Sequence, residues 1–163
     1  MLTTKRLILR AARPDDLDDL HAIYSDPRAM RYWSTPPHPD RATTQGNLDR
    51  LIASAARRLV YFVFEKDGHA IGVGGMHKDY EIGFLLHPDY WRQGFAREAM
   101  QTIIPHLFKV TDAPALTADA DPLNTASVGL LRSLGFDETH RAKNTFCIEG
   151  VWSDSVYFRR KRG

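Results

Sequence analysis

The chain has almost no cysteine: Cys147 is the only one in 163 residues. A single thiol cannot form an internal disulfide, so the sequence excludes a disulfide-stapled fold and fits a reducing cytoplasm. Because the neighbours of Cys147 are apolar or β-branched, we expect a buried or strand thiol and not a nucleophile. The chain also lacks an apolar run near the roughly 18 residues of a membrane span, and its first residues lack a signal-peptide core. These absences predict a cytoplasmic protein without a membrane segment.

Net charge is also small. The 22 basic and 20 acidic side chains leave +2 at neutral pH, which is too little to indicate a nucleic-acid partner. Residues 159–162 form a cationic cluster, which we expect to be solvated because it lies near a chain terminus. Basic and aromatic residues are not interleaved as they are in single-strand binders. Without repeats or low-complexity tracts, the composition predicts one domain spanning residues 1–163.

Hydrophobic periodicity and turn residues place the secondary structure. Asp67-Gly68, between two short apolar runs, is a strong hairpin signal. An antiparallel meander is followed by strand–helix crossovers, and this order indicates an α+β domain of three layers with a mixed sheet. The predicted strands are 7–10, 60–64, 71–75, 80–86, 115–118, 146–148 and 154–159; the predicted helices are 14 to about 26, about 40 to 57, 94 to about 108, and 123–134.

The most informative segment is residues 85–99. An apolar strand leads into a turn, and Gly94 and Ala96 then open a helix. The first N–H groups of a helix have no partner within it, and the helix dipole adds partial positive charge there. Small residues at these two positions let an anion approach the backbone. The segment predicts an anion site suited to a pyrophosphate, although an ordinary strand-to-helix connection would read the same way.

A second informative segment is residues 124–136. It reads as an amphipathic helix with Asn124 at its N-cap and Gly135 at its C-terminus. Taken alone, such a helix indicates core packing more often than ligand contact. In this order and at this spacing, however, the two segments together resemble the GCN5-related N-acetyltransferase superfamily. Residues 4–10, 26–33 and 150–158 further resemble the branch typified by the RimJ/RimL ribosomal-protein N-acetyltransferases.

This resemblance covers essentially the whole chain. It implies a three-layer α/β/α acetyltransferase domain whose mixed, mostly antiparallel sheet is splayed at the cofactor site. It implies acetyl-CoA as cosubstrate, no metal, and direct attack of a primary amine on the thioester in a ternary complex. The acceptor would be a protein N-terminus or a small amine, and the protein a monomer or homodimer.

The resemblance also implies residue roles. In the family the pantetheine arm pairs with the strand before the glycine turn, and the N–H of Leu86 would stabilise the oxyanion. Ser127 matches a hydroxyl that protonates the leaving thiolate in part of the branch, although Asn124 and Ser127 also read as ordinary capping. Trp91 stands where much of the superfamily has Gln or Arg. The RimJ/RimL-like branch commonly has an aromatic residue there, so Trp91 is interpreted as a mark of the branch, although it removes one potential phosphate-binding side chain. The implied cofactor-binding residues are Phe84, Leu85, Leu86, Arg92, Gln93, Gly94, Phe95, Ala96, Arg97, Asn124 and Ser127.

The group that removes the amine proton is less well marked. Glu81 lies on the predicted strand 80–86, whose end would meet the thioester, and family members often use a carboxylate there, directly or through water; a solvated carboxylate is the alternative. His77 has a suitable unperturbed pKa but reads as an exposed turn residue. Some branch members carry a glutamate in the stretch that is 144–146 here, where this chain has none. We expect Asp154 to be structural.

Three functions fit these motifs. The first is the N-acetyltransferase, with Glu81, Ser127 and the Leu86 main chain in catalysis. The second is a non-catalytic acyl-CoA-binding sensor, and the third is a nucleotide-binding protein, which lacks a Walker lysine. Residues 30–39, with two aromatic side chains and three prolines, are expected to line the acceptor side.

Overall fold

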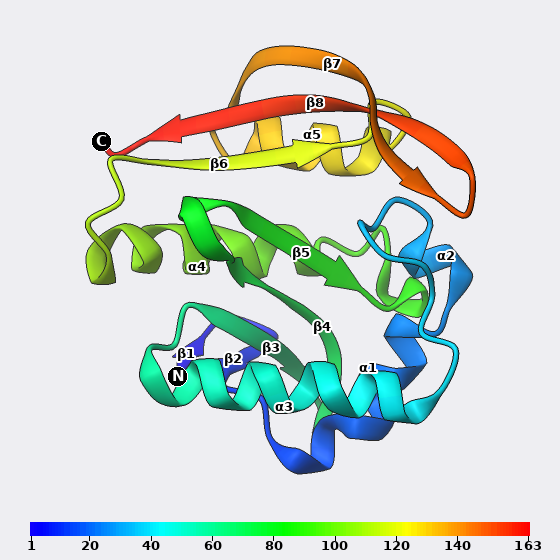
Figure 1. Ribbon diagram of the computed structural model, residues 1–163. Helices are drawn as coiled ribbons and strands as arrows, with labels where there is room; N and C mark the ends of the chain where they lie inside the picture. The colour runs from blue at the N-terminus through cyan, green and yellow to red at the C-terminus, as the bar shows by residue number, and fades with distance from the viewer.

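The computed structural model describes residues 1–163, and its strands form two sheets (Figure 1). The larger sheet has the order β1-β2-β3-β4-β5 and the smaller has the order β6-β8-β7. Neighbouring strands within each sheet are antiparallel. The strands are β1 Leu2–Thr3, β2 Ile8–Arg10, β3 Tyr61–Lys66, β4 His69–Met76, β5 Ile82–Leu86, β6 Ala115–Ala120, β7 Asp137–Ile148 and β8 Val151–Lys161.

An isolated parallel bridge between Glu81 and Thr117 joins the two sheets. After this bridge β5 and β6 form no further ladder, so the backbone edge of β5 is left open toward β6. The combined sheet is therefore mixed, mostly antiparallel and splayed between β5 and β6. This geometry confirms the sheet that the resemblance implied.

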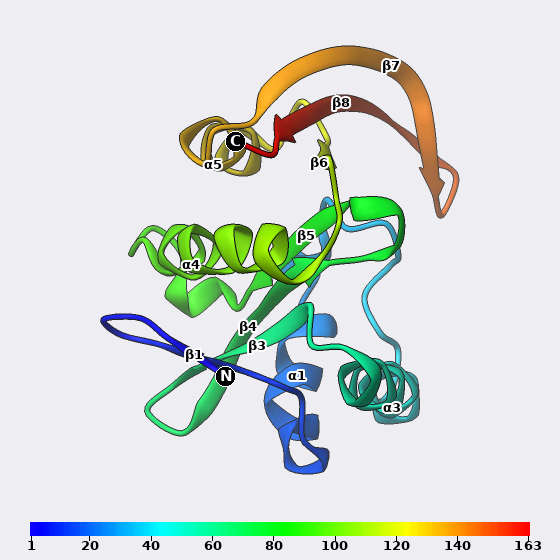
Figure 2. The ribbon, with the colours of Figure 1, turned by 90° about the vertical axis from the view of Figure 1, so that its left-hand side faces the viewer.

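Helices cover both faces of the sheet (Figure 2). Helices α4 (Phe95–Val110) and α5 (Thr125–Ser133) lie on one face, and α1 (Leu17–Tyr24) and α3 (Arg41–Arg57) lie on the other. The short α2 (Pro27–Met30) follows α1. The α+β fold with three layers is confirmed. None of these helices combines the length and the apolar character that crossing a membrane requires.

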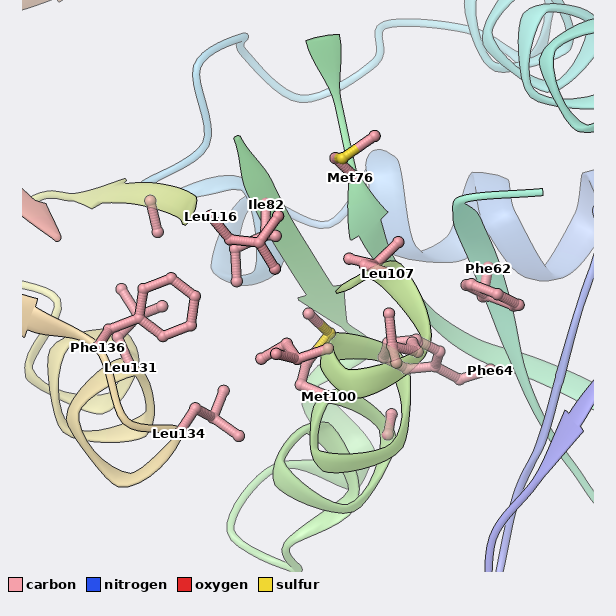
Figure 3. Close-up of a cluster of buried hydrophobic side chains, with 14 of the residues drawn as sticks. Phe62, Phe64, Met76, Ile82, Met100, Leu107, Leu116, Leu131, Leu134 and Phe136 are labelled. Atoms are coloured by element: carbon pink, nitrogen blue, oxygen red, sulfur yellow. The ribbon is translucent and has the colours of Figure 1, made fainter. Parts of the chain in front are cut away.

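The hydrophobic core consists of two clusters on the two faces. In the larger one, Met100 of α4 lies between Phe62 and Phe64 of β3 on one side and Leu131 and Phe136 on the other (Figure 3). This cluster holds α4 and α5 against both sheets, although the sheets share only one bridge. The smaller cluster packs α1 and α3 against β3, β4 and β5 through Leu20, Ile23, Leu48, Val63, Val73 and Leu85.

The predicted turns and helix ends have the expected backbone geometry. Asp67 and Gly68 adopt φ of 51° and 81° between β3 and β4, as a two-residue hairpin turn requires. Gly135 ends α5 at φ 85°. The N–H groups of Gly135 and Phe136 donate to the carbonyls of Arg132 and Leu131, each at 3.1 Å, which is the hydrogen-bond pattern of a glycine C-terminal motif.

A buried ion network fixes the start of α1. The guanidinium of Arg10 makes two bonds to Asp16, of 2.7 and 2.9 Å, and a third to Glu65 at 2.7 Å. The N–H of Arg13 also donates to Asp16 at 2.8 Å. Burial raises the pKa of Asp16, but the hydrogen bonds from Arg10 and Arg13 outweigh it, so the pKa lies below that of an ordinary aspartate.

Several strand boundaries differ from the prediction, and one short strand was not predicted. Only residues 146–148 of β7 were predicted, because residues 137–147 are almost all exposed and the strand therefore has no apolar alternation. Cys147 lies in this strand and is exposed, not buried. Strand β5 begins at Ile82, because residues 78–80 form a 3-10 turn (η2) in which Asp79 and Tyr80 have φ 61°. The two-residue β1, which pairs with β2, was not predicted.

The cationic residues 159–162 are largely exposed, as predicted, but they do not form a frayed end. Strand β8 continues to Lys161, and the N–H of Arg162 donates to the Pro114 carbonyl at 2.9 Å. The guanidinium of Arg160 donates to the Leu134 carbonyl, at the C-terminus of α5. That of Arg162 donates to carbonyls of Phe108, Thr111 and Ala113, at and just after the end of α4. These arginines satisfy carbonyls that helix ends leave without partners.

Candidate functional site

The open edge of β5 presents the backbone of Phe84 and Leu86. Leu86 lies opposite Gly72 in the β4–β5 ladder, and the next N–H, that of His87, donates to Ile71 at 2.8 Å. Because backbone groups of an antiparallel strand alternate between its two neighbours, those of Phe84 and Leu86 point away from β4 and toward the gap. Leu85 points its backbone toward β4 and its side chain into the smaller core cluster.

The start of α4 follows this strand directly. Arg92 and Gly94 adopt φ of 60° and 80°, and Gly94 is the N-cap. No side chain caps this helix, whereas Asp40 and Asn124 cap α3 and α5. The first N–H groups of α4 are therefore available to an anion, as the glycine turn predicts.

The side chains around this turn differ in their surroundings. Arg92, Gln93 and Arg97 are exposed, and the Gln93 amide donates to the Asp89 carbonyl at 3.0 Å. Phe95 is 2% exposed and its side chain packs in the core, so this side chain cannot contact a cofactor. Ala96 is half-buried.

Arg6 is a cation at this turn that the sequence analysis did not identify. Its guanidinium lies 4.1 Å from the centre of the Phe95 ring, and one terminal nitrogen is 3.4 Å from where a Cβ on Gly94 would be. Glu98 holds it through a 2.8 Å ion pair and also accepts hydrogen bonds from the Thr4 hydroxyl and the Arg6 N–H. Arg6 precedes Gly94 by 88 positions, so no local motif links them.

A cavity of about 1150 Å³ lies beyond the bridge between the sheets. One wall contains Glu81, Gly83 and Phe84, and another contains Ala118, Asp119 and Ser127. The predicted acceptor segment also lines it, through Met30 and residues 31–38. The tip of the β7–β8 hairpin reaches it through Phe146, Ile148, Glu149, Val151, Ser153 and Asp154. The α4 turn does not line the cavity, so the site has an anion-binding part and a separate open chamber.

Glu81 lines this chamber. Glu81 is exposed at the chamber, but partial desolvation by the chamber walls raises its pKa, and the charges of Asp119 and Asp79 raise it further. Burial also raises the pKa of Asp119. A carboxylate whose pKa is raised toward neutrality is a better general base than an ordinary glutamate.

His77 faces the same chamber. Its ring centre is 4.9 Å from that of Tyr61, and its Nε2 is 2.8 Å from where a Cβ on Gly83 would be. His77 is exposed, as its turn position predicted, and partial desolvation by its neighbours lowers its pKa, so the imidazole is neutral at pH 7. It is a second group at the chamber that can accept a proton. Asp154 accepts the N–H of Asn144 at 2.9 Å across the β7–β8 hairpin, which is a structural contact.

Asn124 and Ser127 hold each other at the start of α5. The side-chain Oδ1 of Asn124 accepts a hydrogen bond from the Ser127 N–H at 3.2 Å, and the side-chain Nδ2 donates to the Ser127 hydroxyl oxygen at 3.0 Å. The capping geometry is therefore present. Because the Ser127 oxygen accepts in this pair, its own O–H remains able to donate, and Ser127 lines the chamber whereas Asn124 does not.

Comparisons with known proteins identify the family to which this chain belongs. The sequence profile of the acetyltransferase (GNAT) domain matches residues 6–137. The chain belongs to this family, and it is an N-acetyltransferase of the RimJ/RimL-like branch. No group of three or more His, Cys, Asp or Glu side chains is placed to hold a metal ion.

Three relatives define the likeness. The chain is 32% identical over 147 residues to the uncharacterized N-acetyltransferase p20 of Bacillus licheniformis, covering 84% of this chain and 82% of the relative. It is 25% identical over 170 residues to the ribosomal protein uS5-alanine N-acetyltransferase of Escherichia coli, covering 95% and 87%. The structure of RimL, a ribosomal-protein α-N-acetyltransferase in complex with coenzyme A, matches with a TM-score of 0.85 at 18% identity, covering 98% and 96%.

Proposed function

We propose that residues 1–163 act as one acetyltransferase domain that moves the acetyl group of acetyl-CoA to a primary amine by direct attack. The observation that carries this proposal is the open edge of β5 between the uncapped start of α4 and the chamber. Coenzyme A has a pyrophosphate at one end of its arm and a thiol at the other. The anion-binding turn, the open strand edge and the chamber follow one another in that order, so the residues present fit it.

The reaction needs four groups, and the proposal assigns each to this chain. Backbone N–H groups of residues 92–97 hold the pyrophosphate, with Arg92 and Arg97 adding charge. The pantetheine arm pairs with the edge of Phe84 and Leu86, and the Leu86 N–H stabilises the oxyanion that forms when the amine attacks. Glu81 takes the amine proton. As the carbon–sulfur bond breaks, the Ser127 hydroxyl gives a proton to the thiolate.

The acceptor is a protein N-terminus or a small amine. An acetylation screen over peptides and small amines, with mass spectrometry of the products, tests the proposal directly. We expect a mass increase of one acetyl group on at least one amine, together with release of free coenzyme A. Tight acetyl-CoA binding without transfer to any amine would contradict the enzyme and leave the acyl-CoA sensor.

Gly94 provides the first test of the cofactor site. We expect Gly94→Val to weaken acetyl-CoA binding at least tenfold, about 1.4 kcal/mol, because its side chain would stand where the pyrophosphate approaches the backbone. Gly68→Val is the matched control: Gly68 has φ 81°, close to the 80° of Gly94, but lies in the β3–β4 turn with nothing near its Cβ position. Calorimetry that shows equal affinity for folded Gly94→Val and wild type would remove the pyrophosphate from this turn.

Ser127 tests the proton donor. If its hydroxyl protonates the thiolate, Ser127→Ala should lower kcat by about tenfold or more and leave the KM for acetyl-CoA nearly unchanged, because the interaction forms mainly in the transition state. A hydroxyl that only completes the cap would instead cost about 1 kcal/mol of stability and no activity. Ser133→Ala, at the other end of α5, is the control, since Ser133 also bonds only locally. Thermal midpoint and turnover together decide between the two roles.

A further inference from the structure

Trp91 makes a contact that the cofactor motif does not explain. Its indole Nε1 donates to the carbonyl of Leu86 at 2.9 Å, five residues back along the chain. The segment between them contains the 3-10 helix η3 (Pro88–Tyr90). The backbone N–H of Trp91 donates to the Pro88 carbonyl at 3.1 Å and so ends this turn. The side chain therefore folds back over its own loop onto the end of β5. This bond ties the open strand edge to the turn that leads into α4.

The Leu86 carbonyl, which accepts the hydrogen bond of the Trp91 indole, belongs to the open edge of β5. Phe84 and Leu86 each direct one N–H and one C=O toward the gap, because the intervening residues pair with β4. An arm that pairs with this edge therefore has two donors and two acceptors to choose from. The indole removes one acceptor, that of Leu86. What remains is the N–H and C=O of Phe84 and the N–H of Leu86.

A carbonyl that is already bonded at the α4 end of the edge restricts how an incoming strand can pair. On a strand edge whose backbone groups are all free, an extended chain can shift by two residues and form equivalent hydrogen bonds, since the pattern repeats every two residues. Such a shift moves the chain by roughly 6.5 Å. With the Leu86 carbonyl already bonded, the shifted arm would lose its acceptor, so one register is favoured.

We propose that Trp91 is a positioning residue that sets the register of the acyl-CoA arm on β5 by occupying the Leu86 carbonyl. The inference rests on the proposed pairing of acetyl-CoA with that strand. It gives the indole a function in place of the phosphate contact that a Gln or Arg would make at this position. Trp91 would affect the rate because the register of the arm determines where the thioester lies. A misplacement of about 1 Å can cost on the order of 10²-fold in rate.

The test is Trp91→Phe, which keeps an aromatic ring and removes the N–H. Because the shifted arm still forms hydrogen bonds, now with the freed Leu86 carbonyl, the Kd for acetyl-CoA should change less than about twofold. Turnover should fall by at least about tenfold, because part of the bound thioester lies away from the Leu86 N–H. Trp152→Phe is the matched control, because Trp152 is an exposed indole of β8 that does not line the chamber. It should match the wild type in both quantities.

Several outcomes would overturn the inference. They are unchanged turnover in Trp91→Phe, a rise in Kd that accounts for the whole loss of activity, and an equal loss in Trp152→Phe. A lower thermal midpoint with normal kinetics would show that Trp91 only stabilises its loop. If wild-type protein itself neither binds acetyl-CoA nor transfers acetyl groups, the proposed function fails instead.

A second measurement uses the unaltered protein and does not depend on the variant folding. In ¹⁵N-labelled wild type, the Trp91 indole N–H should exchange with solvent more slowly than that of Trp152, because only the former is hydrogen-bonded to a carbonyl. Addition of coenzyme A should leave this exchange slow. Faster exchange of the Trp91 indole in the complex would mean that the cofactor displaces it from Leu86, which contradicts the inference.

Discussion

Replacing Glu81 with glutamine is expected to lower turnover at neutral pH by roughly 10²–10⁴-fold, the range of general acid–base groups. Acetyl-CoA affinity should stay nearly unchanged, because Glu81 faces the chamber and not the α4 turn. A base acts in its ionised form. Since partial desolvation and the charges of Asp119 and Asp79 raise the pKa of Glu81, the acidic limb of the wild-type pH–rate profile should lie at higher pH than for an ordinary glutamate.

The matched control is Glu149→Gln. Glu149 also lines the chamber, but from the tip of the β7–β8 hairpin, so its substitution should preserve both the height and the acidic limb of the profile. Loss of the limb only in Glu81→Gln would assign the proton to Glu81. A Glu81→Gln enzyme that keeps both features would make Glu81 a surface carboxylate and leave water or His77 as the proton acceptor.

The largest expected loss of stability follows from Asp16→Asn. The side chains of Arg10 and Asp16 are 8% and 4% exposed, and removing one charge of a buried pair leaves the other without full compensation. We expect a loss of roughly 3 kcal/mol in the free energy of unfolding at pH 7, at the lower end for such pairs, since Glu65 still contacts Arg10. Asp15→Asn is the control: its carboxylate is 79% exposed, and it should cost less than about 0.5 kcal/mol.

The pH dependence gives this prediction a sign. Because the pKa of Asp16 is lower in the folded state, the stability it contributes is complete above the unfolded pKa of about 4. It is lost as pH falls through the lower folded value. The difference between wild type and Asp16→Asn in denaturant melts should therefore be full at pH 7 and shrink below about pH 4. A difference that stays constant down to pH 2 would mean that the ionised carboxylate is not what stabilises α1.

The sequence predicted best those parts of the fold that depend on local rules. Gly94, Gly135 and the Asp67-Gly68 turn each need a left-handed backbone, and all three have it. Asn124 caps α5 because its side chain reaches an N–H only three residues away. Such features depend on neighbours in the chain, so a short motif contains the information that determines them.

What the sequence did not show depends on distant partners or on exposed strands. Arg6 reaches the α4 turn only because β1 and β2 pack beside it, and Glu98 then holds it there. The sequence marked Trp91 only as a residue typical of the branch in place of a phosphate ligand, because its bond to Leu86 requires the loop to fold back. Strand β7 is paired along most of its length with β8, yet both its faces are largely solvated, so periodicity could not reveal it.

The two arginines that close the ends of α4 and α5 also determine how a protease meets this chain. Residues 159–162 offer trypsin four consecutive cleavage positions, but β8 pairs through Lys161 with Ala115 and the Arg162 side chain is bound to three carbonyls. In the folded protein, the peptide bonds after residues 159–162 should therefore resist digestion conditions that cleave a disordered tail. A recombinant form shortened to Arg159 would lose the guanidinium contacts of both arginines at the C-terminal ends of α4 and α5, and those helix ends should then fray more readily.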